Sequence, residues 1–148
     1  MMLIRTIIIP LFLALIGCAA QPIALQRNTI DTITKQTSPV ELEQILGSAT
    51  IHAQFELSSN EKNYFIRQYN LQTGVTQDVI TVSLPSGGSI PVIVDVPVTT
   101  QYAVIQLLPA KEVFAWGSLE ELSKDQNSEV SSLMPAVKQR IEEFSKKK

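Results

Sequence analysis

Cysteine, histidine and tryptophan are almost absent from this sequence, with one of each among 148 residues. A single cysteine excludes an internal disulfide. The lone histidine, His52, cannot build a multi-histidine metal site or a histidine-based triad, and its strand-like surroundings favour a half-buried structural role. The net charge of −2 leaves no basic patch for nucleic acid. We therefore expect no metal, no cofactor and no nucleic-acid partner.

Groups that carry out catalysis are equally scarce. Asp78 and Asp95 are isolated carboxylates in strand-like segments, whereas a paired-carboxylate hydrolase needs two that converge. The glycine-rich stretch at residues 86–89 is followed by neither a lysine nor a helix, which argues against a phosphate-binding loop. These absences predict a protein that is not an enzyme and has no catalytic residues.

The first 17 residues have the pattern of a signal peptide. Arg5 is their sole charge, and the apolar run from Thr6 to Ile16 is too short to span a bilayer core of roughly 30 Å as a stable helix. The run leads into Leu15-Ile16-Gly17-Cys18, which resembles the lipobox of bacterial lipoproteins. The alternatives are an ordinary secretory signal cleaved near Ala19-Ala20, or an uncleaved anchor in which the cysteine occurs by chance.

The lipobox resemblance implies cleavage between Gly17 and Cys18 and attachment of lipid to the Cys18 thiol. It also explains an odd thiol in an exported protein. Ala19 after the cysteine implies the outer membrane of a Gram-negative cell, with the domain facing the periplasm. In a Gram-positive cell the same residues imply the outer face of its only membrane. We expect residues 18–36, which are polar, to be a tether and residues 37–148 to be one domain.

Start signals for helices lie near both ends of the expected domain. Ser38 and Glu41 form a capping-box pattern for a helix at residues 39–46, and Ser118 with Glu121 repeats that pattern. The last helix is expected to begin near Ser131 or Ser132, with Pro135 in its first turn. Between these helices, alternating apolar residues predict six strands: 50–57, 63–71, 75–84, 90–98, 102–108 and 113–116. The order of elements predicts an α+β fold with a mainly antiparallel sheet, a short N-terminal helix and C-terminal helices packed on it.

The strand at residues 90–98 alternates without interruption but contains two prolines. Pro91 and Pro97 cannot donate backbone hydrogen bonds, so the strand is expected at an edge or broken at its ends. An open edge there could accept a strand from a partner. The competing interpretation is that the prolines simply make the edge passive.

The stretch from about Thr34 to Leu84 resembles the SmpA/OmlA family of outer-membrane lipoproteins, also called the BamE-like group. The resemblance rests on the short helix ending in Leu-Gly, on residues 63–68, and on Gly74-Val75-Thr76-Gln77 with the strand that follows. The Gly-Met-Thr usual before the helix is replaced by Gln36-Thr37-Ser38, and residues 88–148 lie outside the resemblance.

What the family implies is a non-enzymatic role in outer-membrane protein assembly or envelope integrity. We therefore expect a membrane-anchored adaptor or structural factor whose partner is another envelope protein. The alternative is a membrane-tethered binder of lipid or peptidoglycan that uses Tyr64, Phe65 and Tyr69 as a binding surface. Such aromatic residues are more often part of a core.

Overall fold

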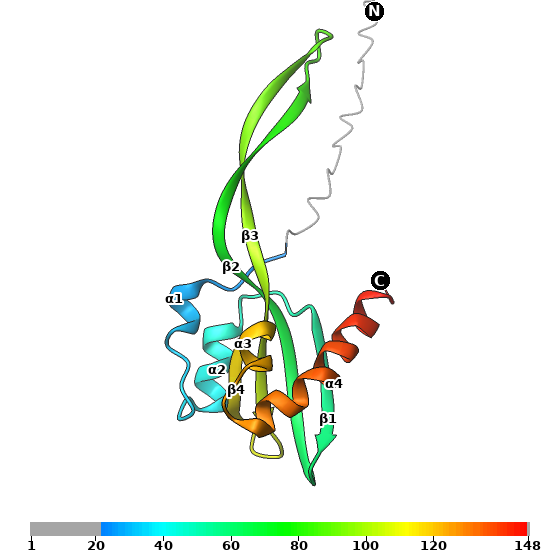
Figure 1. The fold of residues 1–148 in the computed structure, drawn as a ribbon. Coiled ribbons are helices and arrows are strands. Elements are labelled where there is room, and N and C mark those ends of the chain that lie inside the picture. Colours follow the sequence, from blue (N-terminus) through cyan, green and yellow to red (C-terminus); the bar gives the residue numbers. More distant parts are fainter. Residues whose placement is uncertain (1–21, 148) are drawn as a thin grey trace, which may run out of the picture.

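The computed structural model describes residues 22–147, which form a small body with one long projection (Figure 1). Two short helices come first, α1 (Arg27–Ile30) and α2 (Pro39–Leu46). Four strands follow: β1 (Ala53–Ser59), β2 (Lys62–Ser83), β3 (Ser89–Leu107) and β4 (Glu112–Ser118). The chain then forms α3 (Leu119–Ser123) and α4 (Ser128–Ser145).

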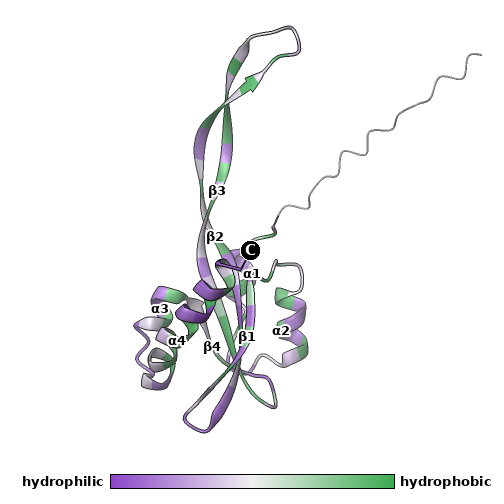
Figure 2. Ribbon diagram, turned by 90° about the vertical axis from the view of Figure 1, so that its right-hand side faces the viewer, coloured by the Kyte–Doolittle hydropathy of each residue, from purple (hydrophilic) through white to green (hydrophobic). Residues whose placement is uncertain are grey.

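The sheet is an antiparallel meander in the order β1-β2-β3-β4, and helices cover both of its faces in the body (Figure 2). One buried cluster joins the sheet to α3 and α4 through residues such as Ile66, Ile105 and Val137. The other joins the opposite face to α1 and α2 through residues such as Leu42 and Tyr69. The predicted α+β class is therefore confirmed.

Both expected capping boxes are formed. The Ser38 hydroxyl accepts a hydrogen bond from the Glu41 backbone N–H, and the Glu41 carboxylate accepts one from the Ser38 N–H. Ser118 and Glu121 make the same reciprocal pair at the start of α3. Each pair satisfies donors that a helix start leaves without an intrahelical partner.

The expected tether is largely part of the body. Leu25, Ile30 and Ile33 are buried in the cluster beneath α2. Leu25 also lies against β2, where its N–H donates to the Asn70 carbonyl at 2.7 Å and its carbonyl accepts from the Gln72 N–H at 2.9 Å. In the sequence these three apolar residues stand singly among polar ones and form no regular pattern. The folded body therefore begins before the expected domain start at residue 37.

The last helix also begins earlier than expected. Asn127 caps α4 by accepting a hydrogen bond from the Glu129 N–H, so the helix starts at Ser128 and Pro135 lies inside it rather than in its first turn. Among residues 22–147, no helix has both the length and the hydrophobicity needed to cross a membrane.

Four of the expected strands merge into two. The segments 63–71 and 75–84 are parts of one strand, β2, because Thr73 forms an irregularity in the register between Gln72 and Gly74 instead of a chain reversal. The segments 90–98 and 102–108 likewise form β3. The result is a twisted two-stranded ribbon, Gly74–Val98, which we call the arm and which extends well beyond the helices (Figure 1).

Candidate interaction surface

The arm exposes hydrophobic side chains along its length. Its 25 residues include eleven Val, Ile and Leu residues, and none of the 25 is buried. Val79 and Ile93, a cross-strand pair, are 62% and 66% exposed. Each side of the arm has eleven residues, which at about 3.3 Å per residue gives a length of roughly 36 Å. An exposed apolar surface this long is characteristic of an interaction site.

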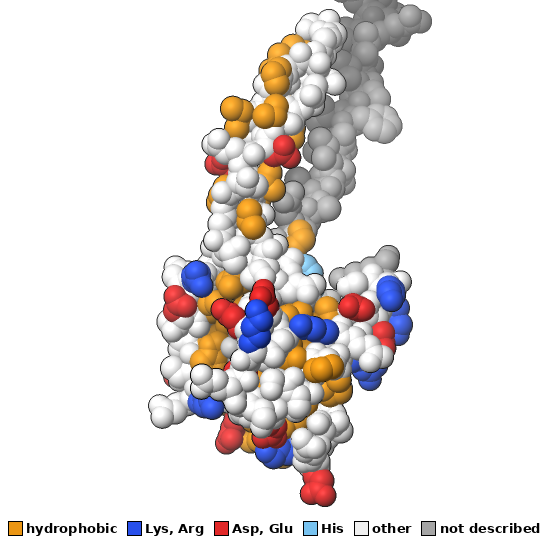
Figure 3. All heavy atoms as spheres, viewed as in Figure 1, with side chains coloured by type: hydrophobic (Ala, Val, Ile, Leu, Met, Phe, Trp, Pro, Cys, Tyr) orange, Lys and Arg blue, Asp and Glu red, His pale blue; other side chains and the backbone are white. Residues whose placement is uncertain are grey.

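Charged residues are almost missing from this surface. Asp78 and Asp95 are the only charged residues of the arm, and the sequence has no lysine or arginine between Arg67 and Lys111. In the space-filling view, the arm carries hydrophobic side chains and acidic ones, whereas the body below shows both charges (Figure 3). Isolated sheet edges are commonly protected by lysine, and the arm lacks that protection.

The two acidic residues lie on opposite faces of the ribbon. Asp78 pairs with Val94, whereas Asp95 pairs with Gln77, whose amide donates to its carboxylate at 3.5 Å. Successive residues of a strand point to opposite faces, and cross-strand partners share a face. A two-carboxylate hydrolase requires the two carboxylates to converge on one site. Asp78 and Asp95 do not converge.

Both faces of the arm are apolar. The face that carries Asp78 also carries most of the branched side chains: Ile80, Val82, Ile90, Val92, Val94, Val96 and Val98. The face that carries Asp95 holds Val75, Val79 and Ile93, together with Pro91 and Pro97. The hydropathy colouring shows this mixture running to the tip (Figure 2).

The two backbone edges of the arm differ. At the tip the Leu84 N–H donates to the Gly88 carbonyl at 3.0 Å, so even-numbered residues of β2 turn their N–H groups toward β3. By alternation, the odd-numbered residues of both strands turn their N–H groups outward. Pro91 and Pro97 therefore remove two donors from the outer edge of β3. The outer edge of β2 contains no proline and has five outward N–H groups from Val75 to Ser83, of which the one of Val79 donates to the Asp78 carboxylate at 2.8 Å.

This asymmetry refines the prediction for residues 90–98. That segment is on an outer edge, as expected, but it is paired with β2 and continues unbroken into the body. Its prolines lie where a missing N–H costs no bond inside the arm. Within the body, Leu25 and β1 cover the outer edge of β2 as far as Gln72, and β4 covers β3 from Tyr102 onward.

The candidate aromatic surface is not formed. Tyr64 and Tyr69 are 0% and 1% exposed and lie on opposite faces of β2, in the two different core clusters. Phe65 is partly exposed, and its ring lies below the Arg67 guanidinium and the Lys111 ammonium at 5.6 and 5.3 Å from its centroid. The odd spacing between Tyr64 and Tyr69 separates them, because an odd offset in a strand reverses the face.

Tyr64 instead belongs to a polar contact between β2 and α4. Its hydroxyl and the Lys62 ammonium both donate to the Glu129 carboxylate. Burial and this acidic acceptor raise the pKa of Tyr64 to about 12. The bonds from Lys62 and Tyr64 lower the pKa of Glu129. The contact attaches the start of α4 to the sheet and offers no reactive group at neutral pH.

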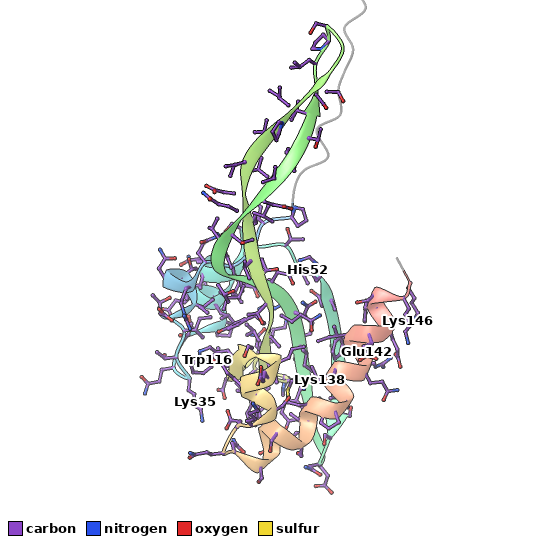
Figure 4. The ribbon with its side chains drawn as sticks, turned by 45° about the horizontal axis from the view of Figure 1, so that its top comes forward. Lys35, His52, Trp116, Lys138, Glu142 and Lys146 are labelled. Carbon is purple, nitrogen blue, oxygen red and sulfur yellow. The ribbon has the colours of Figure 1, made fainter. Side chains whose placement is uncertain are left out.

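A groove of about 700 Å³ lies at the base of the arm, where β3 meets α3 and α4. Its charged lining includes Lys138 and Glu142 of α4 and Lys146, the residue that follows α4 (Figure 4). Of the aromatic residues singled out in the sequence, none lines it. Trp116 lies elsewhere, partly buried against the α1–α2 cluster. The aromatic basis of the ligand-binding alternative is therefore missing from this groove.

The remaining predicted residues lie apart from the arm or outside the described chain. His52 is partly buried just before β1. Residues 22–147 contain no group of three or more His, Cys, Asp or Glu side chains that could hold a metal ion. Gly17 and Cys18, the cleavage and lipidation residues, lie outside the described residues.

The fold and this surface together define an α+β body that carries one exposed β-arm. No family model matches the chain, and neither the curated proteins nor the solved structures include a significant match. The sequence did contain a signal for the arm, namely two segments of similar length, rich in Val and Ile and free of basic residues, on either side of Pro85-Ser86-Gly87-Gly88.

Proposed function

We propose that this protein is a lipid-anchored, non-enzymatic adaptor of the bacterial envelope that contacts another envelope protein through its arm. The observation that carries the proposal is the arm itself, because none of its residues is buried against the rest of the described chain. Eleven branched aliphatic side chains exposed to water favour association with other molecules. We therefore expect a partner to cover this surface. The lipobox pattern at Leu15–Cys18 supports a location in the outer membrane, facing the periplasm.

The expected anchor is close along the chain to Leu25, a residue that contacts the base of the arm. Leu25 contacts β2 at Leu71, next to the point where the arm leaves the body. Leu25 follows Cys18 by seven positions, a distance of at most about 25 Å in a fully extended chain. A lipid on Cys18 would therefore keep the base of the arm near the membrane surface, where proteins being assembled into the outer membrane would be within reach.

Site-specific photocrosslinking in intact cells tests this proposal. A photoreactive residue is placed at Ile93 on the arm and, as the matched control, at Val40, which is 68% exposed on α2 in the body. We expect crosslinks to one or a few envelope proteins from Ile93 and none of those products from Val40. Identical products from both positions, or none from Ile93, would contradict an adaptor role for the arm.

A further inference from the structure

The outer edge of β2 in the arm is free of proline, and no other strand of the described chain pairs with it. Between Val75 and Ser83 five N–H groups and their carbonyls point outward, and no proline interrupts them. The Val79 N–H donates to the Asp78 carboxylate at 2.8 Å, a bond that strand pairing would replace. The other edges are less suitable, because Pro91 and Pro97 interrupt the outer edge of β3, and the edge strands of the body are short and carry Glu56 in β1 and Glu112 in β4.

We propose that this edge pairs with the same edge of a second copy of the chain. Two β2 strands related by a two-fold axis at Val79 would run antiparallel and join the two arms into one four-stranded sheet. Such an axis makes the same patch serve both partners. The open segment Val75–Ser83 has Val79 at its midpoint, so this register pairs every open residue.

The charges of the edge are compatible with self-pairing. In this register Asp78 lies opposite Ile80 of the second copy, and Val79 lies opposite its own counterpart. Like charges directly opposite each other would destabilise a strand pair, and this register contains none. The two Asp78 residues are diagonal neighbours on one face, about 7–8 Å apart, and stay exposed to water, which weakens their repulsion. Because the arm has no basic residue, it offers no complementary charge to an acidic partner strand.

A lipid bilayer is a less suitable occupant of this edge. Unpaired backbone N–H and C=O groups cost several kcal/mol each in hydrocarbon, and a single arm has two open edges. Asp78 lies on the more apolar face of the arm, near the middle of its length, where insertion would also bury its charge. Pairing with a second copy satisfies the backbone of β2 and leaves Asp78 in water.

Disulfide crosslinking of the purified full-length protein tests the proposal. Val79→Cys places a thiol at the proposed two-fold axis. Ile93→Cys is the matched control, because Ile93 pairs with Val79 in the same arm, is equally exposed and lies beside the proline-interrupted edge. The parent protein, with Cys18 alone, controls for the native cysteine. The Cα atoms of directly opposite residues lie about 5.5 Å apart, within the range of a disulfide.

We expect Val79→Cys to form a species of twice the chain mass and Ile93→Cys to form several-fold less of it. Adding Gln77→Pro and Thr81→Pro to Val79→Cys should lower the dimer yield about tenfold, since each removes an outward N–H without breaking a backbone hydrogen bond between β2 and β3. Equal yields from the two cysteines, or no dimer from Val79→Cys, would overturn the proposal. The experiment uses the purified protein, so its result does not depend on whether Cys18 carries lipid or on the identity of the envelope partner.

Discussion

Deleting the arm should leave the stability of the body nearly unchanged. In this variant an Asn-Gly turn joins Gln72 directly to Thr99, which are already cross-strand neighbours. Because none of the 25 arm residues is buried, the deletion removes exposed strand pairing and no core contact. We expect the free energy of unfolding to change by about 0.5 kcal/mol or less, the usual size for changes at exposed positions. Truncating a buried residue of the same strand, Ile105→Ala, should instead cost about 2–5 kcal/mol.

Urea unfolding followed by the fluorescence of Trp116 measures both effects, because this only tryptophan lies in the body and is partly buried. The dependence of the unfolding free energy on urea should also change little, since it follows the surface exposed on unfolding. A loss of more than about 2 kcal/mol on deletion of the arm would show that the arm supports the fold. That result would refute the division of the chain into a folded body and an interaction arm.

The other predictions concern the anchor, a helix cap and an ion pair. Cys18→Ser should release the protein from the membrane fraction, and mass spectrometry of the mature N-terminus should find lipid on the parent Cys18; identical fractionation of both proteins would contradict lipidation. Ser118→Ala should cost about 1 kcal/mol of stability because it removes one half of the capping box, whereas Ser118→Thr should retain most of it; an unchanged thermal midpoint for Ser118→Ala would contradict a structural role. Glu129 has a lowered pKa in the folded state, so its stabilising contribution is present above its unfolded pKa near 4.5 and is lost as the pH falls through the lower folded value. Glu129→Gln should therefore be less stable than the parent at pH 7, and the difference should shrink in urea titrations as the pH is lowered below 4.5; a constant difference would argue against this linkage.

Local patterns in the sequence were sufficient for the elements that depend on neighbouring residues. The capping boxes at Ser38 and Ser118 were predicted because each involves side chains three residues apart and the backbone between them. The antiparallel arrangement was predicted because short turns separate alternating segments. The expected lipid anchor at Cys18 depends on the sequence alone and stays a prediction.

The tertiary structure decided which apolar residues are covered. Leu25, Ile30 and Ile33 are too widely and irregularly spaced in the sequence to indicate a core. All three are nevertheless buried in the cluster that joins α1 and α2 to the sheet. The alternation at residues 90–98 predicts a half-buried strand, yet the helices end below this level and nothing in the described chain covers it. Periodicity shows that a strand has an apolar face, but only the placement of distant elements shows whether that face is buried.

The same distinction applies to the functional residues. Tyr64 and Tyr69 were grouped by their proximity in sequence, and the pleat of β2 places them in separate cores. The continuous passage of β2 through Thr73 and of β3 through Thr99 depends on pairing between residues more than twenty positions apart, which no local motif specifies. The sequence by itself determined the composition and polarity of the arm, whereas the long-range pairing of β2 with β3 determined that these residues form an exposed arm with one intact edge.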